Sequence, residues 1–179
     1  MTLHKVRTHA EGDVLPRSEQ LAWKMAELAT AERPVDDDAV TMVGNRLLDN
    51  AAVALGAINR DPVRHARLLA LGYEHPQRRG AALFGLPSDR TFHCEWVALA
   101  NGVAVRELDM HDCYLAADYS HPGDNIPGVL AAAQQRRCDG AALTRGLLTS
   151  YEIQMALVSG ISLHEHKIDH VAHLSPAVA

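Results

Sequence analysis

Apolar residues recur at spacings of three and four along most of this chain, which is the period of an amphipathic α-helix. The first such stretch follows Pro16, where Leu21, Met25 and Leu28 form one apolar stripe, and Pro34 ends it. The same period predicts further helices over residues 36–58, 63–71, 91–105, 126–137 and 147–160. The stretch over residues 36–58 is apolar over a wide arc, so we expect that helix to be central.

The segments between these stretches carry no strand signal. No part of the chain alternates polar and apolar residues as a half-buried strand does, and no repeat or long linker divides it. Residues 1–15 have no period and are expected to be an extended lead-in, and residues 73–90 are expected to be a loop. The simplest architecture is all-α, with one bundle of about six helices over residues 16–179.

Composition agrees with a globular helical body. Of the 179 residues, 47% are hydrophobic, 22% are charged and 4% are aromatic. This balance excludes a disordered chain, and the scarcity of aromatic residues argues against a β-sandwich. No apolar run is long enough to span a membrane. The net charge of -5 gives no global field that would attract nucleic acid, so neither a membrane nor a nucleic acid is an expected partner.

The cysteines bear on the compartment. Cys94, Cys113 and Cys138 form no closely spaced pair, and the N-terminal residues lack an apolar signal region. We therefore expect a reduced, cytoplasmic chain.

A cluster of histidines near the C-terminus is the first candidate for chemistry. It consists of His164, His166, His170 and His173. On a helix, spacings of three and four would place these rings on one face, as in some metal sites. The cluster does not match the H-E-x-x-H motif, because Ile168 occupies the place of the second histidine. A metal site, a site without metal and a solvated polar helix end are all compatible with the pattern.

The second candidate combines carboxylates with a histidine in a turn. Asp109 and Asp112 are one helical turn apart, so both carboxylates are expected to point the same way. The sequence His121-Pro-Gly-Asp forces a turn that would fix the direction of the imidazole. A carboxylate beside an imidazole selects its tautomer, which suits general acid–base catalysis. The alternative is a helix-capping aspartate with a loop histidine, and Cys113 lies within the same stretch.

Residues 100–133, ANGVAVRELDMHDCYLAADYSHPGDNIPGVLAAA, resemble the signature region of the MmgE/PrpD family. They present the family's Asn-Gly helix, Leu-Asp-x-x-Asp turn and His-Pro-Gly-Asp loop in the same order. The resemblance continues upstream through RLLDNAAVALGAI and downstream through YEIQMAL and HKIDHVAHLSPAV. It covers essentially residues 16–179.

The resemblance implies a lyase that works without a metal or other cofactor, is usually a homodimer, and has a large helical domain with a smaller α+β lid. The implied reaction removes water from a tricarboxylate, 2-methylcitrate or citrate, in propionate catabolism. Family members are longer than this chain. We therefore expect an N-terminal part of the helical domain with the lid absent, exposed apolar surface, and weak or no activity in isolation.

The resemblance also assigns site residues. It places the family's active-site aspartate on Asp109, the histidine of its His-Pro loop on His121 and its second histidine on His173. Asp112, Cys113 and Lys167 are then expected to contact the substrate, with Cys113 where the family often has Thr. A metal at the C-terminal histidines becomes disfavoured, and His164, His166 and His170 become supporting or surface residues. Which group is the base stays open.

Other functions share these features. Decarboxylation of cis-aconitate and epimerisation of a related acid would use the same kind of carboxylate-binding site. A non-catalytic helical dimerisation module is the alternative from another class.

Overall fold

A computed structural model describes residues 9–32, 34–77 and 79–179. Contacts within the chain divide it into two units, Met1–Pro34 and Val35–Ala179. The described part of the first unit contains a 3₁₀ turn, Arg17–Glu19, and helix α1, Leu21–Thr30. Of the predicted lead-in, residues 1–8 lie outside the described part, and residues 9–15 form neither helix nor strand.

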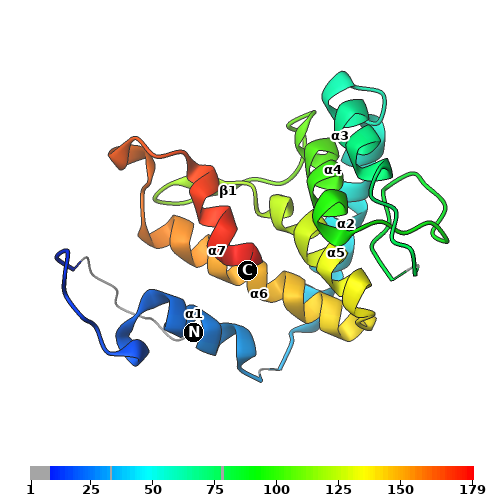
Figure 1. The fold of residues 1–179 in the computed structure, drawn as a ribbon. Coiled ribbons are helices and arrows are strands. Elements are labelled where there is room, and N and C mark those ends of the chain that lie inside the picture. The colour runs from blue at the N-terminus through cyan, green and yellow to red at the C-terminus, as the bar shows by residue number, and fades with distance from the viewer. Residues whose placement is uncertain (1–8, 33, 78) are drawn as a thin grey trace. The chain divides into compact units, whose positions relative to one another are not determined.

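The second unit is helical, as the apolar period predicts (Figure 1). Its helices are α2 (Asp37–Gly56), α3 (Asp61–Leu71), α4 (Cys94–Arg106), α5 (Asn125–Arg136), α6 (Gly140–Gly160) and the short α7 (Leu174–Val178). The all-α prediction is confirmed. No helix in the described residues is long and apolar enough to cross a membrane.

Short-range polar contacts set where these helices begin and end. The carboxylate of Asp36 accepts the backbone N–H of Asp38 at 2.9 Å and caps α2. Asp139 accepts the N–H of Ala142 at 2.8 Å and caps α6 in the same way. Arg137 ends α5 in the left-handed conformation, with φ of 54°. The helix limits therefore follow from local sequence.

Helix α4, rather than α2, is the central helix of the second unit. It packs against α2, α3 and α5, and it buries Val97, Ala100 and Val105 completely. The prediction that α2 is central is wrong, because Leu48 and Leu55 on α2 remain 72% and 50% exposed. Neighbours from this unit, mainly α4 and α6, cover α2 on part of its apolar arc only.

Asn101, in the Asn-Gly pair inside α4, has a packing role. The side chain of Asn101 accepts the N–H of Phe84 at 3.0 Å and donates to the carbonyl of Ala82 at 3.2 Å. It thereby holds the predicted loop between α3 and α4 against the core. Phe92, fully buried, exchanges backbone hydrogen bonds of 2.8 Å with Ala81 on the same loop.

A small hairpin follows α4 and was not expected from the sequence. Strands β1 (Tyr114–Leu115) and β2 (Tyr119–Ser120) pair antiparallel, with Tyr114 opposite Ser120. Strands of two residues are too short to show an alternating pattern, which explains why none was found. The hairpin leads directly into the His-Pro-Gly-Asp turn and delivers it to the candidate site.

Candidate functional site

Asp112 anchors the His-Pro-Gly-Asp turn from inside the fold. Its side chain is 7% exposed. One carboxylate oxygen accepts the N–H of Gly123 at 2.7 Å, and the other accepts the hydroxyl of Tyr151 at 2.9 Å. Burial, followed by the Asp112 charge, raises the pKa of the Tyr151 phenol, so this hydroxyl stays protonated and donates. Nε of Arg46 lies 3.7 Å from the same carboxylate and balances its charge.

The backbone of Asp112 fixes the tautomer of His121. Nδ1 of His121 lies 2.8 Å from the carbonyl oxygen of Asp112. A carbonyl only accepts hydrogen bonds, so Nδ1 must carry a hydrogen. Nε2 of the neutral ring then presents a lone pair, and among the described residues nothing hydrogen-bonds to it. His121 can therefore take a proton at Nε2 and, once charged, return it.

Two further imidazoles lie beside His121. The ring centroids of His111 and His121 are 4.9 Å apart, and those of His121 and His170 are 5.7 Å apart. Tyr119 of strand β2 packs on His170 with a centroid distance of 4.3 Å. These rings come from the turn after α4, the turn after β2 and the 3₁₀ turn His170–His173. The fold thus gathers three imidazoles that are far apart in the sequence.

Arg106 lies between two carboxylates and the imidazole of His111, whose Nε2 is 3.3 Å from its Nη1. Its Nη1 lies 3.5 Å from Oδ1 of Asp109 and 3.7 Å from Oδ2 of Asp124. Nε2 of His111 lies 2.9 Å from Oδ1 of Asp124, and the His111 side chain is fully buried. Asp109 is at the open edge of this group, with its side chain 69% exposed. The group as a whole offers donors and acceptors around His121.

Burial controls the charge of the C-terminal histidines. His170 and His173 are 7% and 4% exposed. Loss of hydration lowers the pKa of both imidazoles, and the opposing charges of Asp169 and Asp118 do not restore it. Both rings are therefore neutral near pH 7. Neither nitrogen of His173 has a hydrogen-bond partner within the described residues.

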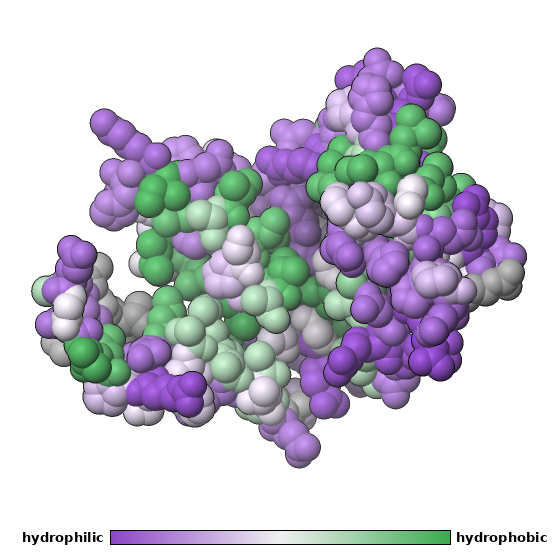
Figure 2. Space-filling model, in the orientation of Figure 1, coloured by the Kyte–Doolittle hydropathy of each residue, from purple (hydrophilic) through white to green (hydrophobic). Residues whose placement is uncertain are grey.

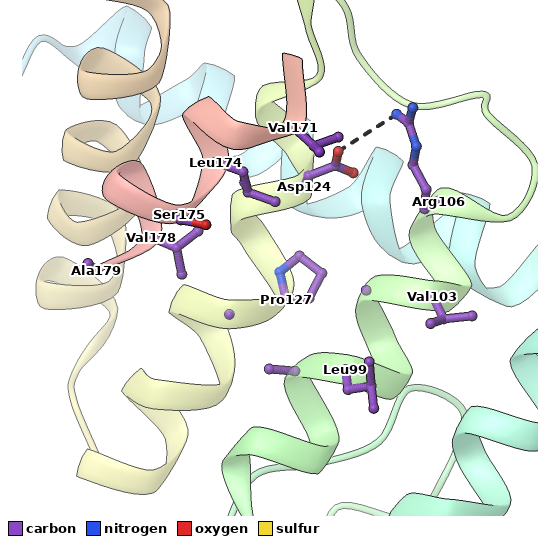
Figure 3. A pocket seen from close by; sticks show the side chains of 13 residues that line it. Leu99, Val103, Arg106, Asp124, Pro127, Val171, Leu174, Ser175, Val178 and Ala179 are labelled. Carbon is purple, nitrogen blue, oxygen red and sulfur yellow. Dashed lines mark ion pairs between the residues drawn. The ribbon is translucent and has the colours of Figure 1, made fainter. Parts of the chain in front are cut away.

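An apolar groove of about 700 Å³ adjoins this group and runs between α4, α5 and α7 (Figure 3). Leu99 and Val103 line one side, and Leu174 and Val178 line the other. Figure 3 shows Arg106 and Asp124 pointing toward each other at one end of the groove. Figure 2 shows apolar side chains gathered over α7, next to the groove.

The site residues do not form a metal centre of the usual kind. Within the residues that the structure describes, no three side chains of His, Cys, Asp or Glu are arranged to hold a metal ion. The chemistry on offer is proton transfer by imidazole and the binding of anionic groups by ring N–H groups and Arg106.

Comparison with known proteins identifies the family. Residues 19–179 match the MmgE/PrpD N-terminal domain. The chain belongs to the MmgE/PrpD family. A mitochondrial 2-methylcitrate dehydratase of Yarrowia lipolytica is 37% identical over 81 residues, which are 39% of this chain and 16% of that protein. A probable 2-methylcitrate dehydratase of Saccharomyces cerevisiae is 32% identical over 95 residues, 46% of this chain and 18% of that protein.

A bacterial relative gives the same result. The 2-methylcitrate dehydratase of Escherichia coli O157:H7 is 31% identical over 80 residues, 39% of this chain and 17% of that protein. The matched stretches therefore span less than a fifth of each of these three relatives. Membership of the MmgE/PrpD family is shown, while the activity of the longer proteins is a separate question.

The two aspartates of this MmgE/PrpD chain do not share a direction, so that prediction is wrong. Helix α4 ends at Arg106, and Asp109 has a positive φ of 51°, which reverses the chain. Asp112 consequently turns into the fold while Asp109 stays in solvent. Substrate contact by Asp112 stays a prediction, and its visible partners are Gly123, Tyr151 and Arg46.

The predicted helical face of four histidines is also wrong. His164–His166 and His170–His173 are separate 3₁₀ turns, and Lys167 between them has a φ of 58°. His164 and His166 are exposed, whereas His170 and His173 are buried. Lys167 and Cys113 are exposed, and their contacts with substrate stay predictions.

Arg106 was absent from the predicted site, and His170 was predicted only as a supporting or surface residue. The structure brings His170, rather than His173, into ring contact with His121. No local signal separates these two histidines, because both lie in the same 3₁₀ turn. Arg106 had a signal, since it precedes Asp109 by three residues, the spacing of an ion pair on a helix.

Proposed function

We propose that this chain carries proton-transfer and carboxylate-binding residues of a hydro-lyase that removes water from 2-methylcitrate, or citrate, in propionate catabolism. The product from 2-methylcitrate is 2-methyl-cis-aconitate. Family membership and the names of the relatives support the substrate class. The observation that carries the proposal is the 2.8 Å contact between Nδ1 of His121 and the Asp112 carbonyl, which leaves Nε2 free for chemistry.

Removal of water from a β-hydroxy carboxylate needs a base and an acid. The base takes the proton next to a carboxylate, charge spreads onto that carboxylate, and the acid protonates the departing hydroxyl. Neutral His121 suits the first task through Nε2, and its protonated form suits the second. Asp109, an exposed carboxylate at the edge of the group, is the other candidate base. His173, the sequence candidate, is buried in the same 3₁₀ turn as His170.

The substrate is an anion, so its carboxylates need donors as charge develops on them. Arg106 offers a guanidinium at the edge of the site, whereas both ring nitrogens of neutral His170 are buried. His111 is already held by Asp124 at 2.9 Å, so we assign it to positioning the rings rather than to proton transfer.

The experiment measures formation of the conjugated double bond by ultraviolet absorbance when the purified hydro-lyase that carries these residues, at its full length, meets 2-methylcitrate. His121→Ala should lower turnover by about 10²- to 10⁴-fold, the usual contribution of a general acid–base group. His166→Ala is the matched control, because it removes an exposed histidine from the neighbouring 3₁₀ turn. Equal turnover in the two variants would remove His121 from the mechanism.

Four further readouts separate the alternatives. Loss of turnover on chelation, with recovery on adding iron, would refute the metal-free mechanism. Release of carbon dioxide from cis-aconitate would identify a decarboxylase, and inversion of a carbon centre without a new double bond would identify an epimerase. Dimer formation without calorimetric binding of a citrate analogue would favour the dimerisation module. A homodimeric state and a cytoplasmic location stay predictions.

A further inference from the structure

Asp118 is a buried carboxylate that joins the hairpin to the C-terminal segment. Its side chain is 2% exposed. Oδ1 accepts the N–H of Tyr119 at 2.8 Å. Oδ2 accepts the N–H of Leu163 at 2.8 Å and that of His164 at 3.2 Å. Nδ1 of His164 lies 3.4 Å from Oδ1.

The backbone of Asp118 is bonded as well. Its N–H donates to the carbonyl of Val158 at 3.2 Å, near the end of α6, and its carbonyl accepts the N–H of Ala116 at 2.8 Å. Burial of the carboxyl opposes ionisation, but the three backbone N–H donors and His164 outweigh it, and the pKa of Asp118 lies below its usual value. Asp118 is therefore an ionised group with a complete set of partners.

The two segments that Asp118 joins carry the rings of the candidate site. Tyr119 follows Asp118 directly and packs on His170 at 4.3 Å and on His164 at 5.0 Å. His121 lies two residues after Tyr119, directly after strand β2. In the described part of the chain, the bonds from Asp118 to Leu163 and His164 are the hydrogen bonds that connect residues 114–120 with residues 163–170.

We infer that Asp118 is a positioning residue, which sets the approach of His170 to Tyr119 and His121 by fastening the hairpin to the backbone at Leu163 and His164. That this approach matters for catalysis rests on the proposed function. The approach of the Tyr119, His121 and His170 rings can be tested without any substrate.

The chemistry of the contact requires a carboxylate. An asparagine has one oxygen and one NH₂ group, so in either orientation of the amide an NH₂ faces backbone N–H donors that now have no acceptor. Asp118→Asn is almost identical in size, and it should release the segment after α6 while leaving the helical core intact.

The test uses nuclear Overhauser effects in the protein without ligand. In Asp118→Asn, the effect between the rings of Tyr119 and His170 should be lost. The effect between Tyr73 and Trp96, stacked at 4.5 Å elsewhere in the same unit, should remain and report a folded core. The turnover number for 2-methylcitrate should fall by on the order of 10²-fold, as expected when reacting groups move by about 1 Å.

Asp139→Asn is the matched control. It makes the same substitution at an exposed carboxylate that caps α6 by accepting one N–H at 2.8 Å. The asparagine oxygen can still accept this N–H, so stability should change little, and both ring contacts and turnover should stay in place. A general effect of losing an aspartate would appear in both variants.

A second variant attacks the contact from its other side. Leu163→Pro removes the N–H that Asp118 accepts, and φ of -70° at Leu163 is compatible with proline. Leu163→Ala loses the same side chain but keeps the N–H, so it should retain the ring contact. If Asp118→Asn does not fold, the comparison of Leu163→Pro with Leu163→Ala tests the positioning role of Asp118 instead.

The outcomes are distinct. Survival of the contact between Tyr119 and His170 in folded Asp118→Asn or in Leu163→Pro would overturn the positioning role. Loss of the contact with unchanged turnover would overturn its importance for catalysis. If the unaltered full-length hydro-lyase does not convert 2-methylcitrate, the proposed function fails, while the ring contacts still decide whether Asp118 positions His170.

Discussion

Gly123 is the point where the turn that holds His121 leaves no room for a side chain. A Cβ at this position would lie 2.7 Å from Oδ1 of Asp112 and 3.0 Å from Nδ2 of Asn50. Both atoms already bond to the Gly123 backbone, Oδ1 to its N–H at 2.7 Å and Nδ2 to its carbonyl at 3.1 Å. Asp112 cannot withdraw freely, because Tyr151 holds its other oxygen at 2.9 Å.

Gly123→Ala must therefore displace Asp112 or move the turn. Forcing an extra methyl group into a packed interior costs about 1–3 kcal/mol. Weakening a hydrogen bond to a buried carboxylate costs about 1.5–3 kcal/mol, and the displacement relieves part of the first cost. We expect the free energy of unfolding to fall by about 2–4 kcal/mol in total. For a chain of this size that corresponds to a loss of about 4–16 °C in Tm.

Thermal unfolding followed by circular dichroism measures this loss directly. Gly140→Ala is the matched control, since Gly140 is the first residue of α6 and a Cβ there would meet nothing within 4 Å. Its Tm should be unchanged or slightly higher, because alanine favours the helix over glycine by up to about 1 kcal/mol. Equal Tm values for the two variants would refute the tight packing of Asp112 against the turn.

Three further predictions concern single contacts. Tyr151→Phe leaves one oxygen of buried Asp112 without its 2.9 Å donor, and urea unfolding should show a loss of about 1–3 kcal/mol; an unchanged midpoint would contradict this. Burial lowers the pKa of His170 and His173, so the unfolded chain binds more protons, and stability should fall as the pH drops below about 6.5. His173→Gln should lose less stability than the unaltered protein between about pH 7 and pH 5, and identical losses would contradict the burial argument. Asn101→Ala should speed hydrogen exchange at the Phe84 N–H, which the Asn101 side chain accepts at 3.0 Å. Unchanged protection of this N–H would show that other contacts hold the loop.

The helices could be predicted because each is encoded locally. The apolar period marks α2, α3 and α5 to within a few residues, and Asp36 caps the start of α2. Helix α6 begins at Gly140, where Asp139 caps it, seven residues before its predicted start. Position within the fold is a different matter. Which side of an apolar helix is covered depends on its neighbours, and for this reason the central role was assigned to α2 although α4 holds it.

The candidate site likewise contains residues whose place could be predicted from local sequence and residues whose place could not. His121 was predictable, because a Pro-Gly-Asp turn follows it directly and fixes its direction. His170 was not, because its contact with His121 spans two turns of chain brought together by the hairpin. The sequence shows four histidines of similar setting, and burial alone distinguishes His170 and His173 from His164 and His166.

The reversal of the chain at Asp109 explains why the two aspartates have different roles. A helical continuation of α4 would place Asp109 and Asp112 on one face, where two like charges would repel each other. With φ of 51° at Asp109, one carboxylate stays in solvent and the other enters the fold beneath the turn of His121. The buried carboxylate can then hold Gly123 and Tyr151 permanently. The exposed one pairs with Arg106 at 3.5 Å, so the chain conformation at a single residue places one aspartate inside the fold and leaves the other at the surface, where we propose that it is a candidate base.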